Sequence, residues 1–132
     1  LLSHEANHVI IAGALGRAGT SMMSEGLASA VLSEERHPIG RSHYYAWTRT
    51  HRAEIPPMSR LVDDNEWGQV PQPVSYAASA SFLAYLLETA GPERLRAVYH
   101  ADSRAFAERF SEVYGKPLNE AEREWLDFCE RR

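Results

Sequence analysis

Residues 1–15 read LLSHEANHVIIAGAL, an apolar run that contains the pattern H-E-x-x-H. Apolar residues occur around almost the whole helical circumference, which predicts a buried α-helix over residues 1–16. An α-helix turns by about 100° per residue, so His4 and His8 share one face, where two imidazoles can bind a single metal ion. Glu5 lies beside that face, from where it can deprotonate a zinc-bound water without being a ligand. A partly buried helix whose histidines have other partners is the alternative.

A second helix, capped by Thr20 or Ser21, is predicted to run to about Leu32. Glu25 lies on this helix, which a tight turn can fold back against the first one. Its carboxylate completes a set of two histidines and one glutamate, leaving a fourth position for water. Gly26 follows it, and a glycine inside a helix costs about 1 kcal/mol relative to alanine. We therefore expect the two helices that share the metal to approach closely at Gly26.

Other metal ligands are less consistent with the pattern. The metzincin pattern requires a third histidine at position 14 and a glycine at position 11, where this chain has Ala14 and Ile11. His43 and His51 are interpreted as surface residues, and a role for one of them at the metal is the alternative.

Residues 33–74 form the least regular part of the chain and hold five of its seven prolines. A helical segment is expected at residues 41–52 and a short turn, capped by Ser59, at residues 59–64. A connection of this length in a compact domain is usually functional or partly disordered. Three aromatic residues in this region are expected to cover the core, and substrate binding is the alternative for them: Tyr44, Tyr45 and Trp47.

Residues 75–132 have regular helical periodicity throughout. The first predicted helix covers residues 75–90 and ends at Gly91-Pro92, and the second covers residues 93–101. A third helix is capped by Asp102 or Ser103 and ends at Gly115. The last helix begins with Asn119 and Glu122 as a capping box. No stretch alternates like a β-strand, so the sequence predicts an all-α fold.

Length and composition narrow the functional classes. The chain of 132 residues fits one domain, residues 1–132, with 44% hydrophobic and 24% charged residues. A net charge of −4 without a basic cluster argues against nucleic acid as a partner. No apolar run is long enough for a transmembrane helix. The single cysteine, Cys129, lies among apolar residues and is expected to be a packed thiol. Oligomeric state is not indicated.

Four short segments together resemble a known family: HEANH at residues 4–8, SEGLA at 24–28, YAASA at 76–80 with FLAYL at 82–86, and GPERL at 91–95. In this order they are similar to the gluzincin zinc metallopeptidases. The resemblance is closest to the peptidase MA-like group and more distant to the M1 aminopeptidases. It extends over nearly the whole chain and is weakest across residues 33–54.

The resemblance implies a role for each of these residues. His4, His8 and Glu25 would bind Zn²⁺, and Glu5 would be the general base in the hydrolysis of peptide or protein substrates. Tyr76 would donate a hydrogen bond to the oxyanion of the tetrahedral intermediate, and a core aromatic at the start of its helix is the alternative. The fold implied is the helical zinc-binding subdomain of a zincin-like metallopeptidase.

Two departures from the family pattern bear on activity. Many gluzincins carry an acid four residues after the glutamate ligand, and this chain has Ser29 there. The β-sheet that precedes the H-E-x-x-H helix in this family has no counterpart in these residues. We therefore expect the chain to be a fragment of a longer protein. The sequence does not indicate the compartment, and the family resemblance is compatible with a secreted or a membrane-tethered protein. A catalytically weak or inactive binding module and a helical interaction domain with a chance motif are the alternative functions.

Overall fold

The computed structural model describes residues 2–36 and 40–132, and in this part of the chain every regular element is helical. The elements are α1 (Leu2–Leu15), α2 (Ser21–Arg36), α3 (Gly40–Thr50), a short 3₁₀ helix η1 (Arg52–Glu54), α4 (Met58–Leu61), α5 (Asp64–Trp67), α6 (Gln72–Ala90), α7 (Pro92–Val98), α8 (Phe106–Tyr114) and α9 (Leu118–Glu130). The predicted all-α class is confirmed. None of the described helices has the length and hydropathy needed to cross a membrane.

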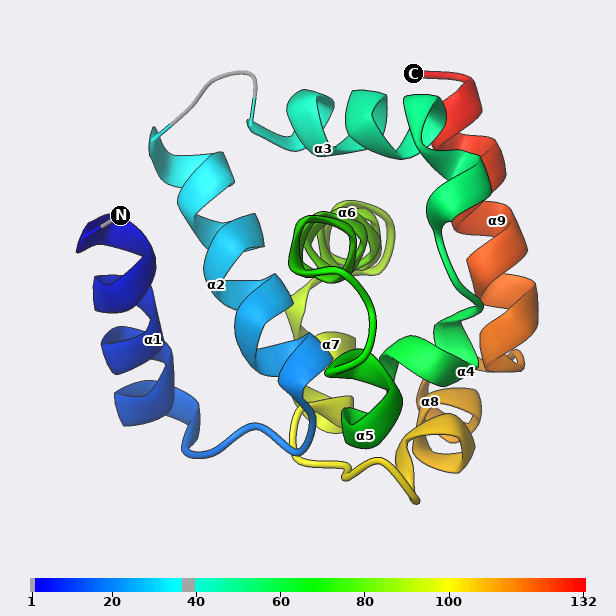
Figure 1. Ribbon diagram of the computed structural model, residues 1–132. Coiled ribbons are helices and arrows are strands. Elements are labelled where there is room, and N and C mark those ends of the chain that lie inside the picture. Colours follow the sequence, from blue (N-terminus) through cyan, green and yellow to red (C-terminus); the bar gives the residue numbers. More distant parts are fainter. Residues whose placement is uncertain (1, 37–39) are drawn as a thin grey trace.

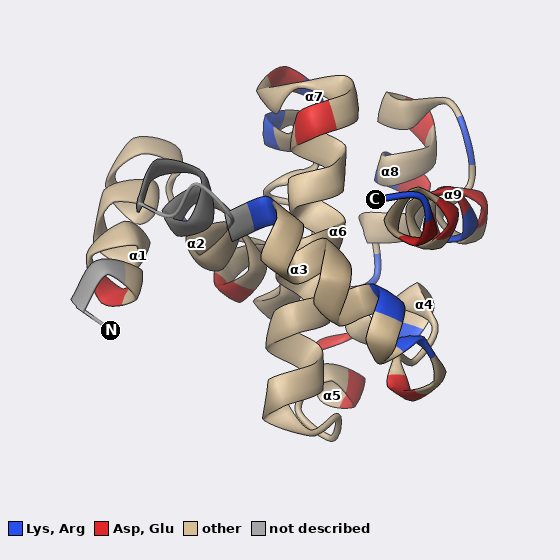
Figure 2. Ribbon diagram, turned by 90° about the horizontal axis from the view of Figure 1, so that it is seen from above, with Lys and Arg blue, Asp and Glu red and all other residues tan. Residues whose placement is uncertain are grey.

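Helix α6 is the centre of the fold. Figure 1 looks along its axis, with α2, α3 and α9 around it, and Figure 2 shows that it is nearly free of charged residues. Its buried residues include Ala78, Ser79, Ala80 and Ser81, whose small side chains let neighbouring helices approach closely. The helix begins at Gln72, three residues before the predicted start, and ends at Gly91, whose φ of 84° is accessible to glycine.

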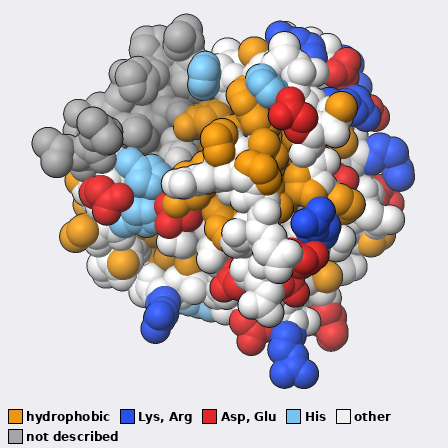
Figure 3. All heavy atoms as spheres, in the orientation of Figure 1, with side chains coloured by type: hydrophobic (Ala, Val, Ile, Leu, Met, Phe, Trp, Pro, Cys, Tyr) orange, Lys and Arg blue, Asp and Glu red, His pale blue; other side chains and the backbone are white. Residues whose placement is uncertain are grey.

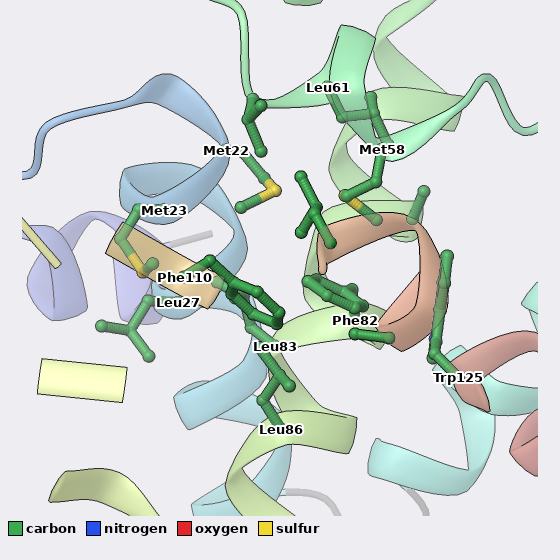
Figure 4. Packing of buried hydrophobic residues seen from close by; sticks show 14 of the residues in the cluster. Met22, Met23, Leu27, Met58, Leu61, Phe82, Leu83, Leu86, Phe110 and Trp125 are labelled. Atoms are coloured by element: carbon green, nitrogen blue, oxygen red, sulfur yellow. The ribbon is translucent and has the colours of Figure 1, made fainter. Parts of the chain in front are cut away.

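The hydrophobic core is formed where the surrounding helices meet α6. Figure 4 shows large side chains from several helices converging there, and the labelled ones are Met22, Met23, Leu27, Met58, Leu61, Phe82, Leu83, Leu86, Phe110 and Trp125. Tyr45 is fully buried and Trp47 packs against this cluster, as predicted. Tyr44, the third aromatic residue expected at the core, is half-buried and has its ring contact with His43 instead. The core therefore joins α2 to the C-terminal helices and gives α2 a fixed position.

Gly26 lies at the closest approach of α2 to α6. A Cβ atom at this position would lie 2.9 Å from both Leu83 Cδ1 and Ser79 Cβ, and 3.0 Å from the Ser79 carbonyl carbon. The expectation of a close helix contact at Gly26 is thus right, but the partner is α6 and not α1. The glycine sets the position of α2 against the core rather than the distance between the two helices of the predicted metal site.

Replacing Gly26 with alanine is expected to destabilise the fold by about 1–2 kcal/mol. Because a Cβ here would meet two atoms at 2.9 Å and a backbone carbon at 3.0 Å, the overpacking cost lies in the upper part of its range, about 2–3 kcal/mol, and the better helix propensity of alanine returns ~1 kcal/mol. Chemical denaturation would measure the change. The matched control is Gly13→Ala in α1, because a Cβ there meets no atom within 4 Å. Equal stabilities of the Gly26→Ala variant and the unmodified protein would contradict the close contact.

Helix α1 lies outside this core. It packs against α2, on the side of α2 that faces away from α6 (Figure 1). Ile11 and Leu15 contact the core, but Val9 is 74% exposed and Ile10 is 65% exposed. The predicted burial of this helix is therefore wrong, because no described element covers the face of α1 opposite α2.

The loop between α1 and α2 is held by residues from the end of α7. The Tyr99 hydroxyl donates a 2.9 Å hydrogen bond to Gly16 O, and Gly19 N donates a 2.9 Å bond to Tyr99 O. The His100 ring adds a third bond of 2.9 Å from Nδ1 to Arg17 O. A Cβ on Gly19 would lie 2.1 Å from Ala101 O, so only glycine permits this approach. We call this set of contacts the loop clamp, and it fixes α1 to the rest of the protein.

Two predicted caps, at Ser59 and at Asn119 with Glu122, are wrong. Helix α9 begins at Leu118 after Pro117, so Asn119 and Glu122 lie inside it and form no capping box. The Glu122 carboxylate instead accepts a 2.7 Å bond from Met58 N, the first residue of α4. Residues 58–61 are helical, and Pro57 rather than Ser59 precedes this turn. The caps differ because their partners come from distant parts of the chain.

A buried polar network joins α3, α6 and α9. Ser81 Oγ lies 2.7 Å from Thr48 Oγ1, accepts a 3.0 Å bond from Trp125 Nε1, and lies 3.8 Å from Cys129 Sγ. The Cys129 side chain is inaccessible, and burial raises the pKa of its thiol. A buried thiol with a raised pKa is a poor nucleophile. This confirms the interpretation of Cys129 as a packed residue.

Candidate metal centre

The candidate metal centre lies between α1 and α2, which run side by side in opposite directions (Figure 1). The start of α2 is held by Thr20, whose Oγ1 accepts a 3.1 Å bond from Met23 N, as predicted for this cap. The four-residue spacing of His4 and His8 directs both rings toward α2, where Glu25 faces them. Local helix geometry and one tight connection are therefore sufficient to bring these residues together.

The three predicted ligand atoms form a compact triangle. His4 Nε2 and His8 Nε2 lie 3.1 Å apart, and Glu25 Oε1 lies 3.2 Å from the first and 3.0 Å from the second. The side chains of His4, His8 and Glu25 are 21%, 26% and 26% exposed. Each side chain is thus held by the protein while the site stays open to solvent on one side. Such an opening leaves room for a further, non-protein ligand.

This triangle fits a zinc ion. Zinc binds imidazole nitrogen and carboxylate oxygen at about 2.0–2.2 Å in tetrahedral sites, which places neighbouring ligand atoms roughly 3.3 Å apart. The observed separations of 3.0–3.2 Å are close to this value. Two nitrogens and one oxygen also match the mixed ligand sets of catalytic zinc sites, which have three protein ligands. The residues present therefore suit the metal that the family resemblance implies.

Two polar side chains orient the first histidine and its helix. His4 Nδ1 lies 3.3 Å from Ser29 Oγ, the position expected for the residue that contacts a ligating imidazole. In the tautomer with its proton on Nδ1, His4 donates to Ser29 and presents the Nε2 lone pair to a metal. Asn7 Nδ2 donates a 3.1 Å bond to Ala28 O and joins α1 directly to α2. Both contacts hold the imidazole face of α1 toward Glu25.

Tyr76, near the start of α6, reaches the same site. Its ring stacks on the His4 ring, with centroids 6.4 Å apart and planes 28° apart, and its other neighbour is Trp67 at 5.7 Å. Burial, the negative charge of Glu25 and a hydrogen bond to that carboxylate raise the pKa of the Tyr76 hydroxyl. The hydroxyl thus stays protonated and can act as a hydrogen-bond donor. Tyr76 is half-buried and also packs against the core, as expected if it is instead a core aromatic at the start of its helix.

Glu5 is the most accessible of the predicted site residues. It is exposed, and a carboxylate oxygen of Glu5 and one ring nitrogen each of His4 and His8 all lie within 4.8 Å of one another. Figure 3 shows histidine and acidic side chains exposed beside each other over α1 and α2. Glu5 contacts neither histidine nitrogen at hydrogen-bond distance among the described interactions. Its carboxylate is therefore near the triangle without belonging to it.

Asn7 makes a contact at the site that the sequence did not predict, and His43 and His51 had been considered for a role at the metal. Asn7 was not predicted, although its place between the two histidines, on the side of α1 toward α2, was a usable signal. His43 is exposed on α3, and His51 stacks on Trp47 with centroids 4.6 Å apart. The described contacts of the candidate metal centre include neither of these histidines: His43 is a surface residue, and His51 is half-buried against Trp47.

No family model matches the sequence, and neither a curated protein nor a solved structure is significantly similar to it. The gluzincin interpretation therefore depends on the segments quoted above and on the geometry of four residues: His4, Glu5, His8 and Glu25.

Proposed function

We propose that this chain is the helical, zinc-binding part of a gluzincin-type metallopeptidase that hydrolyses peptide bonds. The observation that supports this most directly is the triangle of His4 Nε2, His8 Nε2 and Glu25 Oε1, with separations of 3.0–3.2 Å and a separate carboxylate, Glu5, nearby. A structural zinc site is closed by protein ligands and needs no free base, whereas a catalytic site keeps a position for water. The ligand triangle is open to solvent on one side, and the carboxylate of Glu5 lies nearby without being a ligand. Both features favour a catalytic site.

The residues of the site divide the chemistry between them. His4, His8 and Glu25 would hold the zinc ion. When bound, zinc supplies a Lewis acid that polarises the scissile carbonyl and lowers the pKa of a coordinated water to about 7. Glu5 accepts a proton from the attacking water and donates it to the departing amine. General acid–base catalysis of this kind contributes about 10²–10⁴-fold in rate.

Tyr76 is the proposed donor to the developing oxyanion. A tyrosine hydroxyl with its ordinary pKa of about 10 is already protonated at neutral pH, and the raised pKa of Tyr76 acts in the same direction; the hydroxyl lies beside Glu25 at the edge of the site. A donor held in place before the reaction stabilises charge that appears only in the transition state. The stacked contact with the His4 ring and the tilted contact with the Trp67 ring keep the Tyr76 ring beside the proposed metal ligands.

Zinc-dependent peptide hydrolysis is the test of this proposal. The protein, loaded with zinc and incubated with a fluorogenic peptide library, is expected to cleave peptides. A chelator should abolish the cleavage, and stoichiometric zinc should restore it. Cleavage that persists in the metal-free protein would contradict the proposed chemistry.

A zinc-binding module without catalysis is the second candidate. The contact of His4 with Ser29 favours it, because a neutral hydroxyl raises the basicity of a ligating imidazole less than a carboxylate does, and such changes cost about 10–100-fold in affinity or activity. Tight zinc binding without any zinc-dependent cleavage in the library would support this candidate over the first.

A further inference from the structure

An apolar cavity lies beside α1, outside the set of proposed metal ligands. It is a groove of about 280 Å³ between α1, α2 and the junction of α6 with α7. Its lining includes five aliphatic side chains and one charged residue: Ile11, Leu15, Leu27, Leu87, Leu95 and Arg96. We call this cavity the α1–α7 groove. An apolar cleft with a single charged group at its edge is the usual form of a small-molecule site.

The charge at this groove is positive and uncompensated. Arg96 is exposed, and in the part of the chain that the structure describes it makes no ion pair. The neighbouring pocket of about 180 Å³ shares Ile11 and Tyr99 with the groove. It is lined by His8 of the candidate metal centre and by Arg17, another arginine without an ion pair among the described residues. Arg96 and Arg17 are thus positive groups in a chain whose net charge is −4. They favour an anionic group at the edge of the groove.

We propose that the α1–α7 groove binds a medium-chain fatty carboxylate, with the alkyl chain along the leucines and the carboxylate at Arg96. The size of the groove sets the chain length. A dry cavity of about 150 Å³ holds one benzene molecule, so 280 Å³ accommodates a chain of roughly ten carbons. None of the proposed zinc ligands lines the groove itself, and the proposal does not depend on the zinc chemistry.

Chain length is the first test of the groove. Binding of hexanoate, octanoate and decanoate, each below its micelle concentration, is measured by calorimetry on the full chain. Burial of one methylene is worth about fourfold in affinity, so an open groove should give about two- to fourfold per added carbon. Affinity should stop rising near ten carbons. No saturable binding of decanoate, or affinity independent of chain length, would overturn the proposal.

The head group is the second test. Arg96→Gln is expected to weaken decanoate binding about two- to fivefold, the range for an exposed ion pair, and to leave decanol binding unchanged. The matched control is Arg104→Gln, which removes an exposed arginine that does not line the groove. Equal effects of the two substitutions would overturn the assignment of the carboxylate to Arg96.

The location of the ligand is the third test. Leu87→Trp fills the groove from α6 and should reduce decanoate affinity at least fivefold, while a thermal melt checks that the variant folds. In the unmodified protein, decanoate should shift the methyl NMR signals of Ile11, Leu15 and Leu95. If these signals stay unchanged while decanoate binds, the ligand lies elsewhere and the proposal fails.

Discussion

Glu5→Gln is expected to keep zinc bound and to lower peptide hydrolysis by about 10²–10⁴-fold, the contribution of a general base. Glutamine has the size of glutamate but accepts no proton at neutral pH. Because Glu5 is exposed and lies outside the ligand triangle, its replacement should leave the fold and the metal site intact. Steady-state rates with a cleaved fluorogenic peptide, together with the zinc content of the purified variant, measure both parts of the expectation.

The matched control for this variant is Glu108→Gln. Both glutamates are exposed and lie in the first turn of a helix, so each substitution removes the same favourable interaction with the helix N-terminus. Only Glu5 lies at the candidate metal centre, so only its replacement should affect the rate. Undiminished hydrolysis by Glu5→Gln would show that another group, or the solvent, accepts the proton.

His8→Ala is expected to lower zinc affinity by more than about 100-fold. Replacing a residue that only contacts a metal-binding side chain lowers metal affinity by about 10–100-fold. Removing a metal-binding side chain itself should lower the affinity further. His8 Nε2 lies 3.0 Å from Glu25 Oε1 and 3.1 Å from His4 Nε2, so its loss removes two of the three sides of the triangle. Competition with a chromogenic chelator measures the affinity directly.

Thermal stability gives an independent measurement of the same variant. Zinc at 100 times its dissociation constant stabilises the folded protein by about 2.7 kcal/mol, and this gain should disappear in His8→Ala. His43→Ala is the control, because His43 is exposed on α3 and lies outside the triangle. If zinc raises the melting temperature of His8→Ala as much as that of the unmodified protein, the ion binds at another place.

The parts of the fold that follow from short-range chemistry were predictable. The end of α6 at Gly91-Pro92 and the cap of α2 at Thr20 depend on neighbouring residues, and both were found as expected. The pairing of His4 with His8 is equally local, because it follows from helix periodicity. Glu25 needed one further assumption, a tight turn between two helices, and the structure contains that turn.

The parts that depend on distant partners were not predictable. An apolar helix sequence does not reveal whether a neighbour covers each face, and Val9 and Ile10 are exposed for this reason. Gly26 indicated a close approach without identifying the partner as α6. Glu122 had the spacing of a local cap, yet its partner Met58 lies 64 residues earlier in the chain. In each case the deciding contact has no signal in the neighbouring sequence.

The loop clamp has a consequence for the order in which the protein is assembled. The bonds from Tyr99 and His100 to the loop after α1 span 83 residues. Such a contact forms only after the intervening chain has been synthesised and has folded around α6. His4, Glu5 and His8 are the first of these residues to leave the ribosome, yet their helix acquires its full set of supports only once α7 is in place. The earliest-made part of the candidate centre is thus among the last to be secured.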